Sequence, residues 1–253
     1  MKTLIDDFFD PVQYQGKMDE EDYQKIEPCV QTLDAFSRSS NISVYVIDYF
    51  RQNFLYVSTN HLFLNGFSVE EVMQMGYLYY QMFVPEDDLR LLQEINKAGF
   101  SFYYNTLLED RLKYTISYDF HILNKNKRPI LVNHKLTPMV LNPSGQVWLA
   151  MCTVTLSSKD GQGDIVMSKI DEDIEYVYSL QSRKWKKKGL ISLSEREIDI
   201  LRLSSQGLSN SEIGEKIFID VNTVKFHKKN VFHKFDVKNI TEAIAYAVNK
   251  KLI

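Results

Sequence analysis

The chain has 253 residues, enough for two domains that each bury a core of their own. A hydrophobic content of 44%, with 15 Tyr and 15 Phe, indicates a folded chain rather than a disordered one. No apolar run approaches the ~18 residues of a membrane span, and Asp6 and Asp7 interrupt the apolar start, which argues against a secretory signal. Two cysteines without metal-binding spacing predict a cytoplasmic protein with no metal site.

The net charge of −3 hides an asymmetry along the chain. Residues 1–182 contain 15 Lys/Arg and 25 Asp/Glu, whereas residues 183–253 contain 15 and 8. A basic C-terminal part on an acidic body predicts a polyanionic partner for the C-terminal part alone.

Residues 1–39 are expected to form an arm followed by a helix. The first 18 residues are mixed in character, so we expect a loosely held arm. From residue 19 to residue 39, apolar residues at helical spacing predict one apolar face, which Phe36 ends. Such a helix covers a sheet or contacts a second copy, and the pattern does not choose between these roles.

The next segment, residues 40–157, predicts five strands and several helices. Residues 42–49 and 53–58 are rich in β-formers and predict a hairpin, and short helices follow across 60–82. Pro85 begins a longer helix, which we expect to end at Gly99. Three strand-like segments follow, separated by good turn sequences: 113–123, 129–141 and 146–157.

This order of elements resembles a PAS domain. The motifs that carry the resemblance are YVSTNHLFLNGFSVEEV at 56–72 and FVPEDD at 83–88. The resemblance implies an α+β fold, a five-stranded antiparallel sheet with helices on one face, which senses a small molecule or contacts a protein. No flavin motif is present and the helix at 86–98 has no His, so no cofactor is predicted. The aromatic residues of 77–104 line a pocket or, more commonly, form the core.

Residues 158–190 predict a linker that contains a β-hairpin, with strands at 165–170 and 174–180. The hairpin leads into a basic run of Arg183, Lys184 and Lys186–Lys188. Two interpretations stay open for this run. It supplies phosphate contacts, or it is an exposed edge strand whose charges prevent pairing with other strands.

Residues 191–253 predict an all-α domain of four short helices. Ser194 with Glu197 and Ser209 with Glu212 have the spacing of capping boxes. Gly207 suits the end of the first helix, whose expected apolar face is Ile198, Leu201 and Ser205, and Asp220 suits the start of the third. Val224, Val231 and Phe235 predict the buried face of that third helix.

The opposite face of the third helix gathers Asn222, Lys225, Phe226, Lys229 and His233. Lys reaches guanine or phosphate in a DNA major groove, Asn reads adenine, and an apolar ring touches a thymine methyl group. A tight turn before such a helix is the geometry of DNA-binding helix-turn-helix proteins.

Residues 193–247 resemble a LuxR-type helix-turn-helix domain. LSEREIDIL, QGLSNSEIGEKI, NTVKFH, VFHKF and EAIAYA carry the resemblance without a gap, with Ile240 where the family usually has Arg. It implies that Lys225, Phe226 and Lys229 face bases or nearby phosphates. Contacts to the DNA backbone are implied for Asn210, Ser211, Asn222 and Thr223. Lys228 is a further candidate for DNA binding.

Together these features predict a sequence-specific DNA-binding transcriptional regulator, not an enzyme. The PAS-like domain would sense a small molecule or a protein and control operator binding by a homodimer, whose further partner is RNA polymerase. No nucleophile elbow, phosphate loop or metal-ligand spacing is present to support catalysis. The alternatives are an acyl-homoserine-lactone-type receptor and an adaptor whose helix-turn-helix binds protein.

Overall fold

The computed structural model describes residues 8–12, 14–172, 174–189, 191–250 and 252–253. The chain divides into two compact units. The N-terminal unit comprises Met1–Leu156 and Gly161–Lys188, and the C-terminal unit comprises Ser157–Asp160 and Gly189–Ile253.

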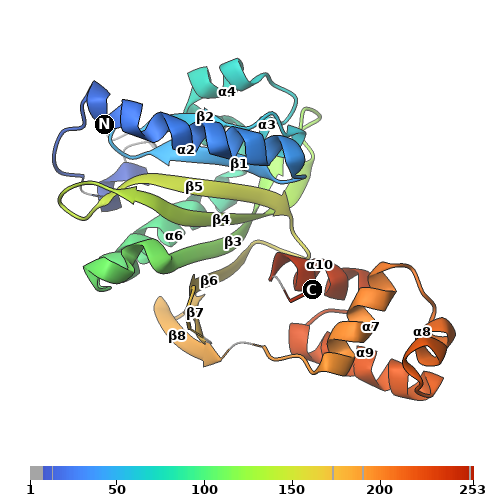
Figure 1. Cartoon of the computed structure of the whole chain (residues 1–253). Coiled ribbons are helices and arrows are strands. Elements are labelled where there is room, and N and C mark those ends of the chain that lie inside the picture. The colour runs from blue at the N-terminus through green and yellow to red at the C-terminus, as the bar shows by residue number, and fades with distance from the viewer. Residues whose placement is uncertain (1–7, 13, 173, 190, 251) are drawn as a thin grey trace. The chain divides into compact units, whose positions relative to one another are not determined.

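The N-terminal unit is built on one eight-stranded antiparallel sheet with the strand order β2-β1-β5-β4-β3-β6-β7-β8 (Figure 1). The strands are β1 (Ser43–Asp48), β2 (Asn53–Val57), β3 (Tyr114–Leu123), β4 (Pro129–Leu141), β5 (Val147–Leu156), β6 (Gly163–Lys169), β7 (Ile174–Ser179) and β8 (Lys184–Gly189). All five strands expected between residues 40 and 157 are present.

The expectation that the sheet ends after five strands is wrong. β6 pairs with β3, with Thr115 opposite Ser168, and β7 and β8 extend the sheet further. A strand at a sheet edge presents unpaired backbone N–H and C=O groups, and pairing satisfies them. The hairpin predicted inside a linker therefore completes the sheet.

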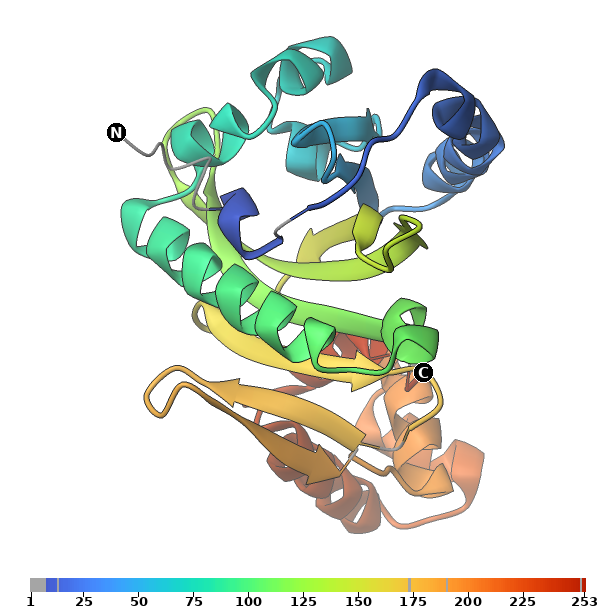
Figure 2. The ribbon, with the colours of Figure 1, turned by 90° about the vertical axis from the view of Figure 1, so that its left-hand side faces the viewer.

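Helices cover both faces of this sheet, whereas the PAS resemblance implied helices on one face only. Side chains alternate along β1, so Tyr45 and Ile47 enter the main core while Val46 faces the other side. The main core lies under α3 (His61–Leu64), α4 (Val69–Met75), α5 (Leu78–Phe83) and α6 (Glu86–Tyr104). α6 runs lengthwise across the sheet (Figure 2). The second face packs against α2 (Glu20–Ser39) around Trp148.

The predicted end of α6 at Gly99 is also wrong, because the helix spans Glu86–Tyr104. Gly99 lies inside the helix and is buried. A Cβ atom there would lie 3.1 Å from Cδ1 of Ile116 on β3. The residue therefore allows α6 to approach the sheet closely and does not end the helix.

The N-terminal arm is not loosely held where it is described. Phe8, Phe9 and Val12 are buried in the main core, and the Tyr104 hydroxyl donates a hydrogen bond to the Val12 carbonyl at 2.9 Å. A short 3₁₀ helix, η1, spans Asp10–Val12, and a second, η2, spans Leu108–Lys113. Residues 1–7 and 13 lie outside the described residues.

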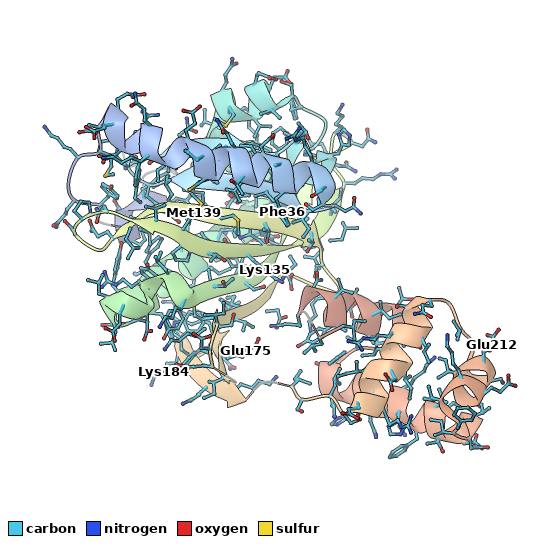
Figure 3. All side chains as sticks on the ribbon, viewed as in Figure 1. Phe36, Lys135, Met139, Glu175, Lys184 and Glu212 are labelled. Atoms are coloured by element: carbon cyan, nitrogen blue, oxygen red, sulfur yellow. The ribbon has the colours of Figure 1, made fainter. Side chains whose placement is uncertain are left out.

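The expected apolar face of α2 is correct except at its end. Tyr23, Ile26 and Leu33 pack against the cluster around Trp148. Phe36 is 50% exposed and projects from the helix (Figure 3), and its neighbour Ser37 is buried in its place. The Ser37 hydroxyl hydrogen-bonds with the hydroxyl of Tyr56 at 2.8 Å.

The C-terminal unit contains the four expected helices: α7 (Glu195–Ser205), α8 (Asn210–Ile217), α9 (Val221–Phe235) and α10 (Ile240–Asn249). Both predicted capping boxes are formed, and Asn239 caps α10. The predicted apolar face of α7 is partly wrong, because Ser205 is exposed while Ile200 and Leu203 are buried. α7 packs on α8 through those two residues and on α9 and α10 through Leu201, so its buried surface is wider than one stripe.

Candidate nucleic-acid interface and ligand cavity

A left-handed residue and a backbone hydrogen bond close the tight turn between α8 and α9. Phe218 ends α8 in the left-handed region with φ 56°, and the backbone N–H of Ile219 donates to the Gly214 carbonyl at 2.9 Å. A Cβ atom on Gly214 would lie 2.7 Å from the Ile219 carbonyl oxygen. The side chain of Asp220 then accepts the Asn222 N–H at 2.7 Å and starts α9. The helix–tight turn–helix expected from the sequence is therefore present.

α9 has the two faces that the sequence predicts. Val224, Val231 and Phe235 are buried, with exposures of 0%, 1% and 1%. All five residues assigned to the opposite face are exposed: Asn222, Lys225, Phe226, Lys229 and His233. Phe226 is apolar, and yet 60% of its surface is exposed to solvent. An exposed aromatic ring between two ammonium groups is consistent with a surface that binds a partner.

The other candidate residues are placed less uniformly. Ser211 is exposed and Asn210 half-buried in the first turn of α8, and Thr223 is half-buried in the first turn of α9. Lys228 lies four residues after Val224 and three before Val231, so its stem follows the buried face. It is half-buried, and burial lowers the pKa of its ammonium group. The structure therefore does not group Lys228 with Lys225 and Lys229.

A contact that the sequence reasoning missed fixes α9 to the start of α7. The Nζ atom of Lys234 lies 2.7 Å from Oε2 of Glu197, and it also donates to the Ser192 carbonyl at 2.9 Å. Burial acts to raise the pKa of Glu197, but the hydrogen bonds from Lys234 and Ser194 outweigh burial and lower it. The sequence predicted only the capping-box role of Glu197, at the start of α7. Nothing in the local sequence indicated its contact with Lys234.

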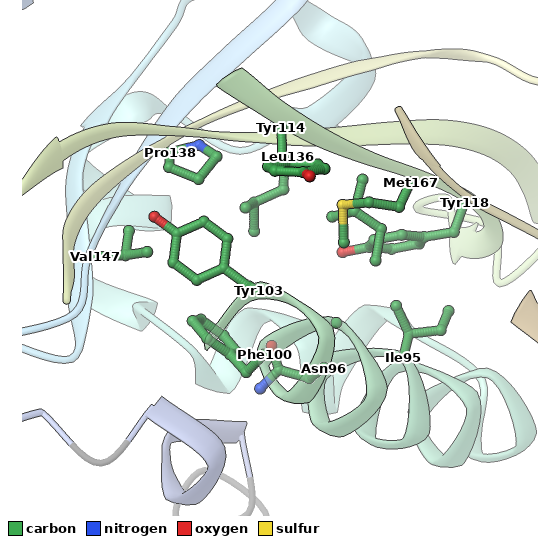
Figure 4. A pocket seen from close by; sticks show the side chains of 12 residues that line it. Ile95, Asn96, Phe100, Tyr103, Tyr114, Tyr118, Leu136, Pro138, Val147 and Met167 are labelled. Carbon is green, nitrogen blue, oxygen red and sulfur yellow. The ribbon is translucent and has the colours of Figure 1, made fainter. Parts of the chain in front are cut away.

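The N-terminal unit contains a cavity between α6 and the sheet (Figure 4). Its volume is about 40 Å³, and a single water needs roughly 10–15 Å³ by this measure. Its lining is mostly apolar: Ile95, Gly99, Phe100, Ile116, Leu136, Pro138, Val147 and Met167, together with Asn96, Tyr103, Tyr114 and Tyr118. The buried hydroxyl of Tyr103 has no hydrogen-bond partner among the described residues. In this conformation the cavity has room for a few water-sized groups.

The aromatic residues of 77–104, for which core and pocket were both open, serve mainly as core. Six of the eight are buried, and Phe100 and Tyr103 also line the cavity. Deeper in the core, the Tyr45 hydroxyl lies 2.5 Å from the Tyr80 hydroxyl and 2.6 Å from Nε2 of His134. Burial lowers the pKa of His134 to about 3, so the imidazole is neutral near pH 7.

The described part of the chain contains no group of three or more His, Cys, Asp or Glu side chains placed to hold a metal ion. It also contains no helix with the length and apolarity that crossing a membrane requires.

Comparison with known families assigns the C-terminal unit. Residues 191–247 match the family described as "Bacterial regulatory proteins, luxR family". These residues contain α7, α8 and α9 and most of α10. Residues 191–247 thus form a LuxR-type helix-turn-helix domain, of a family described as bacterial regulatory proteins.

Individual relatives match over limited parts of the chain. The oxygen regulatory protein NreC of Staphylococcus haemolyticus is 29% identical over 136 residues, 54% of this chain and 58% of that protein. The transcriptional regulatory protein LiaR of Bacillus subtilis is 45% identical over 62 residues, 24% of this chain and 29% of LiaR. A solved phage VqmA–DPO complex matches 90% of both chains at 15% identity, with a TM-score of 0.33. The chain therefore spans less than two thirds of NreC and of LiaR.

Proposed function

We propose that this protein is a sequence-specific DNA-binding transcriptional regulator that binds its operator as a homodimer. The N-terminal unit acts in this proposal as a PAS-like sensor of a small molecule or a protein partner. The observation that carries the proposal is the exposed face of α9, within a domain of the LuxR family.

The proposed contacts follow the geometry of that face. Lys225, Phe226 and Lys229 face bases or nearby phosphates, because they are exposed on one side of α9. Asn222 and Thr223 lie in the first turn of α9, and Asn210 and Ser211 in the first turn of α8. Helix N-termini favour anions, which suits these four residues for phosphate contacts. The long side chain of Lys228 extends from the buried face toward phosphate.

Support for the sensor role comes from the sheet and the cavity. β1 to β5 form the antiparallel sheet that the PAS resemblance implies, and α3 to α6 lie over one face. The cavity between α6 and that sheet is where a PAS domain is expected to hold a ligand. Its lining is mostly apolar, and the Tyr103 hydroxyl has no partner among the residues that the structure describes, which together suit a small, mainly apolar molecule with one hydrogen-bonding group.

Binding of the full-length protein to pooled genomic DNA fragments tests the proposal. We expect selection of a small set of fragments, on which Lys225→Ala and Lys229→Ala each weaken binding by ~1–3 kcal/mol if they contact bases. Arg202→Ala, an exposed position on α7, is the matched control. Loss that is equal on every fragment would reassign both lysines to phosphates. If the wild-type protein selects no fragment, the DNA-binding proposal fails and the protein-binding adaptor is favoured.

A further inference from the structure

The positive charge of the C-terminal part does not lie mainly on its helices. Residues 189–253 contain ten Lys/Arg and eight Asp/Glu, so this stretch is nearly neutral. Residues 183–188 contain five basic residues and no acidic one. Most of the positive excess predicted for a polyanion-binding module is therefore on β8 and the residue before it.

The positive charge of β8 is exposed to solvent. Its four lysines are exposed: Lys184, which projects from the strand in Figure 3, Lys186, Lys187 and Lys188. None of the four forms an ion pair with a described residue, whereas Arg183 has a carboxylate oxygen of Glu94 at 3.7 Å. Some lysines elsewhere in this unit are paired, for example Lys169 with Asp110 and Glu172.

The strand is also held in place, because Trp185 fixes it to the N-terminal unit. Its ring centroid lies 5.0 Å from that of Tyr178 and 5.1 Å from that of Phe102 on α6. Side chains alternate along a strand, so Lys184, Lys186 and Lys188 share the side opposite Trp185. Their spacing along the strand is about 7 Å. An ordered row of unpaired ammonium groups matches a regular row of phosphates better than it matches a compact anion.

We propose that β8 is a second DNA-contacting element, which binds phosphates of the duplex flanking the operator. This inference rests on the proposed function, because it assumes that α9 binds the operator itself. Five residues separate the end of β8 from the start of α7, and the chain between them spans about 20 Å when extended. That reach is less than one helical turn of DNA, which is about 34 Å, so β8 contacts the neighbouring phosphates.

The test is the salt dependence of DNA binding by the full-length protein. The variant is the triple substitution Lys184→Gln, Lys186→Gln and Lys188→Gln, which removes the row opposite Trp185. The control removes the same charge from exposed positions elsewhere in the N-terminal unit: Lys17→Gln, Lys97→Gln and Lys125→Gln. Fluorescence anisotropy with a selected fragment and with a scrambled one is measured from low to high salt.

Each phosphate contact contributes about 0.9 to the slope of log affinity against log salt. We expect the β8 variant to lose about two to three units of slope on both fragments and to keep its preference for the selected one. The control is expected to keep the wild-type slope. Equal slopes in the β8 variant and the control would overturn the proposal and leave the strand as a protected sheet edge. An unchanged slope with new self-association in the β8 variant would overturn it in the same way.

Failure of the proposed function gives a different result. If wild-type protein shows no preference between the fragments while the β8 variant still loses slope, operator recognition by α9 is wrong and the β8 contact stands. Circular dichroism of each variant shows that the change in slope is not caused by unfolding.

Discussion

Lys234 near the end of α9 lies 2.7 Å from Glu197 at the start of α7, and the carboxylate of Glu197 also closes the capping box with Ser194. Glu197 is 3% exposed, so its charge depends on these partners. We expect Lys234→Met to destabilise the C-terminal unit by ~1–3 kcal/mol, because the substitution leaves a buried carboxylate with fewer partners. Urea unfolding followed by helical circular dichroism measures this loss. An unchanged unfolding free energy would show that Ser194 alone satisfies Glu197.

Gly214 is required by the turn between α8 and α9. Gly214→Ala places a Cβ atom 2.7 Å from the backbone oxygen of Ile219, and neither backbone can move without disturbing the turn. We expect a loss of ~1–3 kcal/mol, although alanine is the better helix former. Gly161→Ala, where a Cβ atom meets nothing within 4 Å, is the control and should have little effect. Thermal unfolding distinguishes the two, and equal midpoints would contradict the steric argument.

Phe226 and Val231 lie on different faces of α9, so substitutions at these two residues distinguish an effect on DNA binding from an effect on stability. Phe226 is 60% exposed and Val231 is 1% exposed. Phe226→Ala should leave the unfolding free energy within about 0.5 kcal/mol while weakening DNA binding. Val231→Ala should destabilise the unit by roughly 1–3 kcal/mol. Unfolding curves and DNA titrations of both variants test this, and a large loss of stability in Phe226→Ala would remove Phe226 from the interface.

Two buried tyrosines of the N-terminal unit differ in their hydroxyl groups. The Tyr79 hydroxyl donates to the Phe63 carbonyl, whereas the Tyr103 hydroxyl has no partner among the described residues. Tyr79→Phe should cost about 1–2 kcal/mol, because it leaves a buried carbonyl without its donor. Tyr103→Phe should be neutral or stabilise the unit by up to about 1 kcal/mol. A clear loss in Tyr103→Phe, seen in denaturant unfolding, would show that its hydroxyl has a bound partner.

His134 predicts how stability depends on pH. Burial lowers its pKa to about 3 from 6.5, so the unfolded chain takes up a proton that the folded chain does not. The contribution of neutral His134 to the free energy of unfolding is fully present above about pH 6.5. It is lost as the pH falls toward 3, by up to ~1.4 kcal/mol per pH unit. Unfolding free energies of wild type and His134→Gln between pH 7 and pH 4 test this slope. His61→Gln, at an exposed position, is the control and should keep the wild-type slope.

The sequence by itself determined the local features of this protein. Helix caps at Ser194, Ser209 and Asp220, the two faces of α9 and the first five strands all depend on side-chain period and on hydrogen bonds within a few residues. The match of residues 191–247 to the luxR family agrees with that reading. Contacts of the candidate residues with DNA stay a prediction.

The tertiary structure alone decided what depends on distant neighbours. α6 continues through Gly99 because the helix packs closely against Ile116 of β3 there. Phe8 is buried because it packs into the main core of the N-terminal unit. β6 to β8 extend the sheet because β3 offered an unpaired edge. Lys234 meets Glu197 across 37 positions of sequence. Spacing along the chain cannot specify such contacts, because their free energy depends on which surfaces the folded chain brings together.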